Sequence, residues 1–292
     1  MSNLLRAGFA RLFRSRMYWI VLALTVVICY FNVYQKTSMW SAERICFDSV
    51  PVVLFFVPIF IARFIGAEYE GSAMRNMLIV GKRKSEIYIS NVVVCSVGNI
   101  ILLAVTLLST GIFALTHYNK FVCEPKVTLF YVICAVLITV SSTAVFTLLS
   151  LLNSKTAVNA VVCILLVIGI LVVAMVINEQ LSKPKMREML YSDDIEYLDS
   201  ILDPEEQQRY WEEHAVVEPN PRYVGGAKRK VYELLQTVNP MYQANELSNA
   251  ALVTANSDEP EPLRFDWIMG SIGLTASTTA LGLLLFRRKD IE

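Results

Sequence analysis

Long runs of apolar residues, separated by short polar segments, constrain this chain more than any other feature of its sequence. Hydrophobic residues make up 55% of the chain and charged residues only 18%, and the charged residues occur in blocks between the apolar runs. A helix needs about 20 mostly apolar residues to cross the hydrocarbon core of a bilayer, whereas a water-soluble domain interleaves apolar and charged residues. We therefore predict an all-α polytopic membrane protein with six transmembrane helices. The predicted spans are residues 17–34, 51–64, 88–115, 129–152, 157–177 and 267–286.

The second predicted span is short for a crossing. It reaches full length only if the Arg63 side chain extends its charged end toward the membrane surface and the helix runs on past residue 64. Pro51 suits the first turn of a helix, with Asp48 or Ser49 as the cap. Pro58 lies inside the span and predicts a kink.

An amphipathic helix is predicted over residues 1–16, ahead of the first span. Leucines and phenylalanines recur there at helical spacing with arginines between them, which is typical of a helix in the membrane interface. The arginines are Arg6, Arg11, Arg14 and Arg16. A cleavable signal peptide is disfavoured, because no small-residue cleavage site follows the apolar run. A generic positively charged anchor explains the arginines equally well.

Lysine and arginine mark the cytoplasmic side of a membrane protein, and here they predict the orientation. With the N-terminus inside, the inner segments hold Arg6, Arg11, Arg14, Arg16, Arg63, Arg75, Lys82, Arg83, Lys84, Lys155, Arg287, Arg288 and Lys289. The two short outer loops hold only Lys36, Arg44, Lys120 and Lys126. Both termini are therefore predicted to be cytoplasmic.

The long polar region between the fifth and sixth spans must then lie outside. We predict a small, compact, mostly helical extracellular domain there, with helices over 185–202, 204–214, 228–237 and 241–253. The candidate core residues are Leu190, Ile195, Leu198, Leu202, Trp211, Tyr232, Leu234 and Leu235. The predicted division is residues 1–178 with the first five spans, 179–266 as the extracellular domain, and 267–292 as the sixth span and tail.

The segment that follows the second span, residues 63–91, is patterned rather than merely polar. Drawn as a helix at about 100° per residue, residues 67–78 form two faces. The apolar face holds Ala67, Met74, Met77 and Leu78, and the polar face holds Glu68, Ser72, Arg75 and Asn76. Gly81 predicts the C-terminal end of this helix, and the basic cluster of residues 82–84 follows it. We predict a short amphipathic helix that lies along a membrane surface or docks on a partner.

Catalytic motifs are missing from the sequence. It contains no GxxxxGK[ST] phosphate loop, no GxGxxG after a predicted strand and no HExxH. Two histidines and six cysteines lack metal-binding spacing, and no carboxylate lies in the middle of a predicted span, where an ion-coupled transporter would need one. An enzyme acting alone is therefore not predicted, nor a cofactor, metal or nucleic-acid site.

Two further patterns leave alternatives open. The hydroxyl and small residues of the fourth and sixth spans suit helix packing within a bundle, and a polar translocation path is the alternative. Cys46 and Cys123 both fall in predicted outer segments, where they either form a disulfide or remain free thiols; free thiols are preferred.

The segment after the second span resembles the corresponding cytoplasmic loop of ABC-2 type permeases, the membrane subunits of a class of ABC transporters. The residues that carry the resemblance are Gly66, Glu68, Tyr69, Gly71, Arg75, Asn76, Gly81, Arg83 and Tyr88. Six spans with both termini inside agree with that family along the whole chain, and residues 222–240 also resemble the region before the last span in some bacterial members. The sequence departs from the family at Ser72, Met74 and Met77.

The resemblance implies a partner for this chain. It would be half of a transmembrane homodimer or heterodimer in the bacterial plasma membrane, coupled to a cytosolic ATPase that binds ATP and Mg²⁺. Residues 67–78 would form the coupling helix, with Glu68, Glu70 and Arg75 in polar contact with the ATPase. Met74, Met77 and Leu78 would seat the helix in the ATPase cleft. The exported cargo would be a hydrophobic or amphipathic peptide, antibiotic or drug-like compound.

Two other interpretations of the same residues stay open. The amphipathic segment is alternatively a connector that rests on lipid, with Lys82, Arg83 and Lys84 on anionic headgroups. The whole chain is alternatively a non-transporting receptor or assembly protein whose outer domain binds a ligand.

Overall fold

The computed structural model describes residues 1–36, 40–71, 73–117, 120–189, 203–256 and 264–289. Contacts divide the chain into two compact units. The first unit comprises Met1–Ala174 and Gln236–Glu292, and the second comprises Met175–Leu235.

Six helices in the described residues are long and apolar enough to cross a membrane, as predicted. They are α2 (Arg16–Tyr34), α4 (Val50–Glu70), α6 (Lys84–Thr116), α7 (Pro125–Leu152), α8 (Thr156–Leu181) and α13 (Phe265–Arg288). The second span extends beyond the predicted residues 51–64 at both ends, and its continuation past residue 64 is the extension that a full-length crossing was predicted to need. The helix α4 runs on past Phe64 to Glu70, and the short helix α3 (Ala42–Asp48) precedes it within one apolar stretch of 29 residues.

The helix α7 is central to the first unit, where it packs against α4, α6 and α13. Its hydroxyl residues are buried inside the unit, and Asn99 of α6 donates a hydrogen bond to Thr143 of α7 at 3.0 Å. Ser141, Thr139 and Thr143 also bond to carbonyl groups of their own helix. The hydroxyl face of the fourth span therefore serves packing within this unit.

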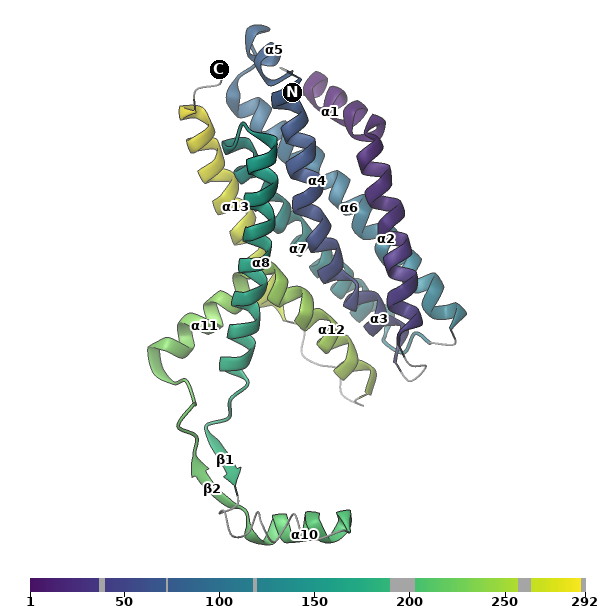
Figure 1. The fold of residues 1–292 in the computed structure, drawn as a ribbon, viewed down its shortest axis with the longest axis vertical. Helices are drawn as coiled ribbons and strands as arrows, with labels where there is room; N and C mark the ends of the chain where they lie inside the picture. The colour runs from purple at the N-terminus through teal and green to yellow at the C-terminus, as the bar shows by residue number, and fades with distance from the viewer. Residues whose placement is uncertain (37–39, 72, 118–119, 190–202, 257–263, 290–292) are drawn as a thin grey trace. The chain divides into compact units, whose positions relative to one another are not determined.

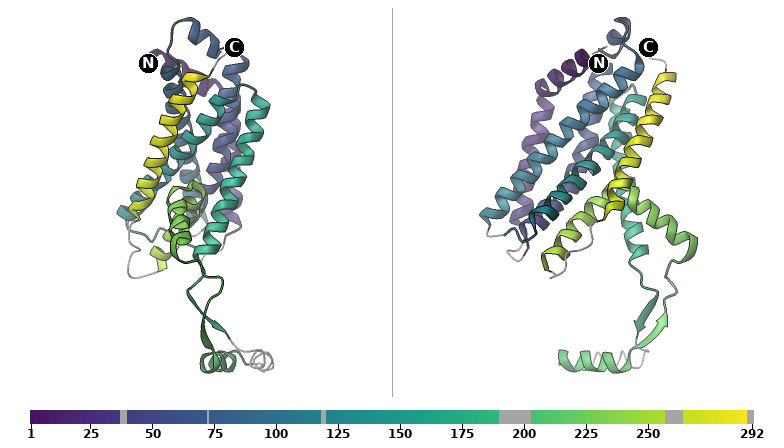
Figure 2. Two further views of the ribbon diagram at one scale, coloured as in Figure 1. Left: turned by 90° about the vertical axis from the view of Figure 1, so that its left-hand side faces the viewer. Right: turned by 180° about the vertical axis from the view of Figure 1, so that it is seen from behind.

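The N-terminal helix α1 (Ser2–Arg14) is present and separate from α2, with Ser15 in an extended conformation between them. Its apolar face packs on α6, where Gly8 approaches Val94 so closely that an added Cβ would lie 2.7 Å from a methyl group. Within the first unit, α1 and the end of α13 lie at one end of the bundle, whereas α3 lies at the other end (Figures 1 and 2).

The helix α12 (Pro240–Asn256) belongs to the first unit, although we predicted its residues to lie in the extracellular domain. It packs on α3, α4 and α7 and buries Met241, Ala244, Leu247 and Ala251 completely or nearly so. These apolar positions recur at helical spacing and face the bundle. The bundle offers α12 a larger apolar surface than the polar region between the fifth and sixth spans does.

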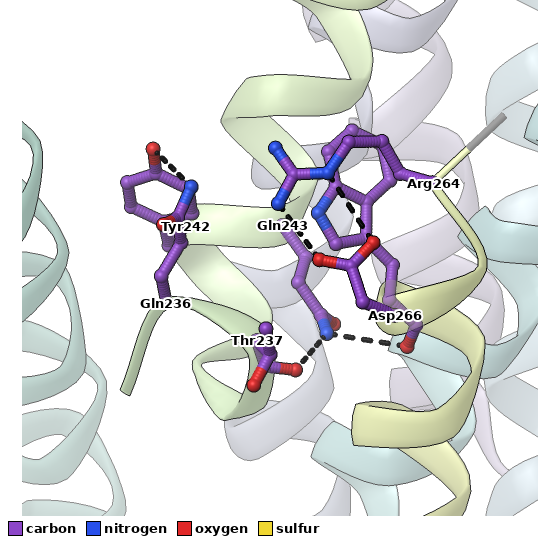
Figure 3. A network of polar contacts seen from close by, with 7 residues as sticks. Gln236, Thr237, Tyr242, Gln243, Arg264 and Asp266 are labelled. Carbon is purple, nitrogen blue, oxygen red and sulfur yellow. Dashed lines mark hydrogen bonds and ion pairs between the residues drawn. The ribbon is translucent and has the colours of Figure 1, made fainter. Parts of the chain in front are cut away.

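A buried glutamine joins α12 to α13 (Figure 3). The Gln243 amide nitrogen donates to the carbonyl oxygens of Thr237 and Trp267, and its carbonyl oxygen accepts a bond from Ser271 at 3.0 Å. Gly270 is needed for this close approach, because a Cβ there would overlap with the Thr237 carbonyl group. This network holds the chain before the last span against that span.

The second unit differs in part from its prediction. The helix α10 (Pro204–His214) is present, and α11 (Gly226–Val238), which ends in the first unit, covers the predicted helix over 228–237. The prediction of a helix over 185–202 is wrong at its start, where β1 (Met186–Met189) pairs antiparallel with β2 (Val216–Pro219). Pairing with the β-branched Val216 and Val217 overrides the helix propensity of the first strand. Residues 190–202 lie outside the described residues.

The predicted core of the extracellular domain is not formed by its described members. Trp211, Leu234 and Leu235 are exposed and Tyr232 is half-buried. Leu190, Ile195, Leu198 and Leu202 lie outside the described residues.

Candidate functional site

The last two turns of the second span and the chain after it, residues 63–71 and 73–81, form the site to which the sequence points, and we call this site the α4–α5 junction. We predicted one helix over 67–78, but the structure divides it. The helix α4 ends at Glu70, and after Gly71 a second helix, α5, runs over Ala73–Ile79. Glycine is a poor helix former because it loses the most backbone freedom on folding, so a break at Gly71 has a local cause.

The end of α5 follows the prediction at Gly81. This residue has a φ of +82°, which is strained for residues with a side chain. Its N–H donates to the carbonyl of Leu78 at 2.9 Å, and the N–H of Lys82 donates to that of Met77 at 3.1 Å. These two bonds are the Schellman motif, which satisfies the last carbonyl groups of a helix and fixes the direction of the chain beyond it.

Glu68 lies inside the protein rather than on the exposed polar face where we predicted it. Only 2% of its side chain is exposed, and its carboxylate forms an ion pair with Arg11 of α1 at 2.5 Å. Asn91 of α6 donates a hydrogen bond to the other carboxylate oxygen at 3.0 Å. Glu68 therefore joins α4 to α1 and α6. The residue faces inward because α4 continues without a break through this turn and keeps the rotation that its packing imposes.

Glu70 and Tyr69 lie on different sides of the last turn of α4. Glu70 is exposed and pairs with Arg63 at 3.2 Å, a surface ion pair of little energetic consequence. The Tyr69 hydroxyl donates to the carbonyl of Leu151 at the end of α7 at 2.6 Å. The Lys289 ammonium donates to the same carbonyl at 3.0 Å and to the Tyr69 hydroxyl at 3.1 Å. Burial lowers the pKa of Lys289. These contacts tie the ends of α4 and α7 to the residue that follows α13.

The helix α5 is anchored on one side and exposed on the other. Met74 is buried, at 1% exposure, whereas Arg75 is exposed. Met77 and Leu78, which we predicted to seat the helix in a partner, are half-buried against this chain. Ile79 and Val80 are 73% and 75% exposed. The outward surface of α5 thus combines one arginine with two adjacent apolar side chains.

Sequence reasoning found the α4–α5 junction but missed the residues that hold it, which are Arg11, Asn91, Tyr69 and Lys289 in their present roles. The available signal was Glu68 itself, a carboxylate in a helix that continues an apolar span. Such a group needs a cation and hydrogen-bond donors when it is buried. Arg11 and Asn91 lie far from Glu68 in the sequence, so the sequence gives no reason to pair them with it.

The cysteines carry no bridge in the described residues, since Cys46 and Cys123 are both free thiols. Burial, reinforced by the nearby Glu43 carboxylate, raises the pKa of the Cys123 thiol to about 11. That carboxylate is held in place by the backbone N–H groups of Val122 and Cys123, at 2.7 and 2.8 Å.

No family model matches the chain, and no curated protein sequence matches it at a significant level.

Proposed function

We propose that this chain is the membrane-spanning permease subunit of an ATP-driven exporter of the ABC-2 type. In this proposal α5 is the coupling element on which a cytosolic ATPase docks. The observation that carries the proposal is the exposed face of α5, a short, capped helix next to a long apolar span, which presents Arg75 and Ile79 outward, with the exposed Val80 directly after it. Exposed adjacent apolar side chains beside a charge are typical of an interaction surface.

The burial of the junction residues supports different roles for them from those that the sequence pattern predicted. In this proposal Arg75, Ile79 and Val80, whose side chains are exposed, contact the partner. Glu68 and Met74 are buried within this chain and act as positioning residues for α4 and α5. Glu70 remains available on the surface, since its contact with Arg63 is exposed.

The contacts of the junction supply a route by which movement of α5 reaches the spans. The helix α5 begins three residues after the last residue of α4, and Glu68 joins α4 to α1 and α6. Tyr69 joins α4 to α7 and to Lys289. A push on α5 would therefore move several spans together as a rigid body, which is a common form of transport-related conformational change.

The remaining parts of the proposal follow from the family resemblance. The chain works as a homodimer or heterodimer in the bacterial plasma membrane with both termini in the cytoplasm. The partner subunit binds ATP and Mg²⁺ and hydrolyses ATP. The cargo is a hydrophobic or amphipathic peptide, antibiotic or drug-like compound.

Capture of the native assembly tests the proposal. The chain is purified with a tag from its native membrane, and the proteins that accompany it are identified by mass spectrometry. We expect a cytosolic ATPase with a phosphate loop, and we expect Arg75→Glu to reduce its recovery by at least about tenfold, since a like-charge contact in an interface costs several kcal/mol. Arg209→Glu, in α10, makes the same charge change at another exposed site and serves as the control.

Two outcomes would overturn the proposal. One is an assembly without any ATPase. The other is an ATPase whose recovery is the same for Arg75→Glu and for the wild-type chain. Glu68 is unsuitable for this test, because its substitution also breaks the internal ion pair with Arg11.

A further inference from the structure

A cavity of about 390 Å³ lies beside the N-terminal helix. Its walls come from the end of α1, the start of α2, the second half of α4 and the first residue of α5. All of these elements belong to the first unit. Its size is in the range of ligand-binding cavities, about 300–1,000 Å³. Arg14, Arg16 and Met17 are exposed, so the cavity is open to the surface.

The cavity is strongly basic. Its lining contains four arginines, Arg11, Arg14, Arg16 and Arg63, against a single carboxylate, Glu68, which leaves three positive charges. Arg11 is engaged by Glu68, and Arg63 by Glu70 outside the cavity. In the part of the chain that the structure describes, no carboxylate lies within ion-pairing distance of Arg14 or Arg16. Two guanidinium groups at the mouth are thus free to bind an anion.

One wall of the cavity is apolar. It consists of Met17, Val21, Ile59, Phe60 and Phe64. On α2, Val21 follows Arg16 by more than one helical turn, and on α4, Ile59 precedes Arg63 by one turn. The two helices run in opposite directions (Figure 1), so Arg16 and Arg63 lie nearer the α1 end of the bundle than Val21 and Ile59 do. The cavity therefore has a basic mouth and an apolar wall.

We propose that this cavity binds an anionic phospholipid. Its phosphate lies against Arg14 and Arg16, and the upper part of an acyl chain lies along Met17, Val21 and Ile59. Guanidinium groups bind phosphate oxygens through paired, charge-assisted hydrogen bonds, and basic pockets between membrane-spanning helices suit anionic headgroups. The apolar wall favours a lipid over free phosphate. This inference depends only on the chain being embedded in a membrane and not on a transport function.

Retention of lipids on the purified full-length chain tests this assignment. The chain is purified in detergent, exposed to mixed micelles that contain phosphatidylglycerol or phosphatidylcholine, and examined by native mass spectrometry. We expect retention of phosphatidylglycerol but not of phosphatidylcholine. We expect the Arg14→Gln/Arg16→Gln double variant to bind phosphatidylglycerol at least about tenfold more weakly, since each change removes a charge-assisted contact. The Ile59→Asn variant should also bind it more weakly, because the apolar wall is then interrupted.

The control is the Arg6→Gln/Arg209→Gln double variant. It also removes two positive charges, but at exposed positions outside the cavity, one of them on α1. It should retain the lipid like the wild-type chain. An equal loss in the control would mean general charge attraction and would overturn the assignment. Equal retention of phosphatidylcholine would overturn it as well, and so would displacement of the lipid by millimolar inorganic phosphate, which would mean that the apolar wall contributes nothing.

Discussion

Substituting Arg11 should destabilise the protein much more than substituting Glu68, although the two residues form one ion pair. The reason is that the two side chains differ in exposure. The Glu68 side chain is 2% exposed, whereas that of Arg11 is 37% exposed. The Arg11→Gln variant leaves a buried carboxylate without a cation, and such a loss typically costs about 3 kcal/mol or more in the free energy of unfolding. The Glu68→Gln variant leaves an arginine that water can reach, so its cost is discounted to about 1 kcal/mol.

The double variant gives the sharper prediction. In Glu68→Gln the new side-chain amide keeps a carbonyl oxygen, which can still accept the hydrogen bond that Asn91 donates at this position. In Arg11→Gln/Glu68→Gln no buried charge remains, so its cost should return to about 1 kcal/mol. Adding Glu68→Gln to Arg11→Gln should therefore increase stability by about 2 kcal/mol, although the same change alone decreases it.

Unfolding by sodium dodecyl sulfate in mixed micelles provides the measurement, with the free energy followed against the mole fraction of the denaturing detergent. Arg6→Gln is the control on the same helix and should change stability by less than about 0.5 kcal/mol. Equal costs for the two single variants would refute the reasoning, and so would additive costs in the double variant.

Three further predictions use other parts of the chain. Gly270→Ala places a Cβ against the Thr237 carbonyl and should cost at least about 2 kcal/mol, whereas Gly273→Ala, with nothing within 4 Å of its Cβ, should be neutral or stabilising in the same unfolding assay; equal effects would contradict the close approach. Gly81→Ala should lower the stability of the end of α5 by about 1–2 kcal/mol, because residue 81 has a positive φ. The change should appear as faster amide hydrogen exchange over residues 73–80. Unchanged exchange would argue against the capped end. The pKa of Cys123 is raised to about 11, so little of the thiol is ionised at pH 8. Iodoacetamide should therefore modify Cys123 at least about tenfold more slowly than a free cysteine peptide, and the rate should rise toward pH 11. A rate equal to that of the peptide would be inconsistent with this environment.

The long spans could be predicted from the sequence because hydropathy over about 20 residues is a strong and local signal. The same holds for α1 and α10, whose helical patterns need no distant partner. The cap at Gly81 was also predictable, since a glycine after a helix commonly takes the left-handed conformation that ends it.

Contacts between distant segments explain what the sequence did not predict. The inward direction of Glu68 depends on how α4 packs against α1 and α6, which the helical periodicity of residues 67–78 alone cannot reveal. The docking of α12 on the bundle requires Gln243 to meet Ser271 across a long separation in the chain. The strand β1 exists only because β2 pairs with it, and local propensity carries no information on that partner.

Cross-linking from the exposed end of α5 tests the central claim most directly. A photoreactive amino acid is placed at Val80, whose side chain is 75% exposed, and the cells that naturally produce the protein are irradiated. The account predicts a covalent product with a cytosolic ATPase that contains a phosphate loop, and it predicts less of this product in the Arg75→Glu background. Products with lipid alone, or with a protein that binds no nucleotide, would contradict it.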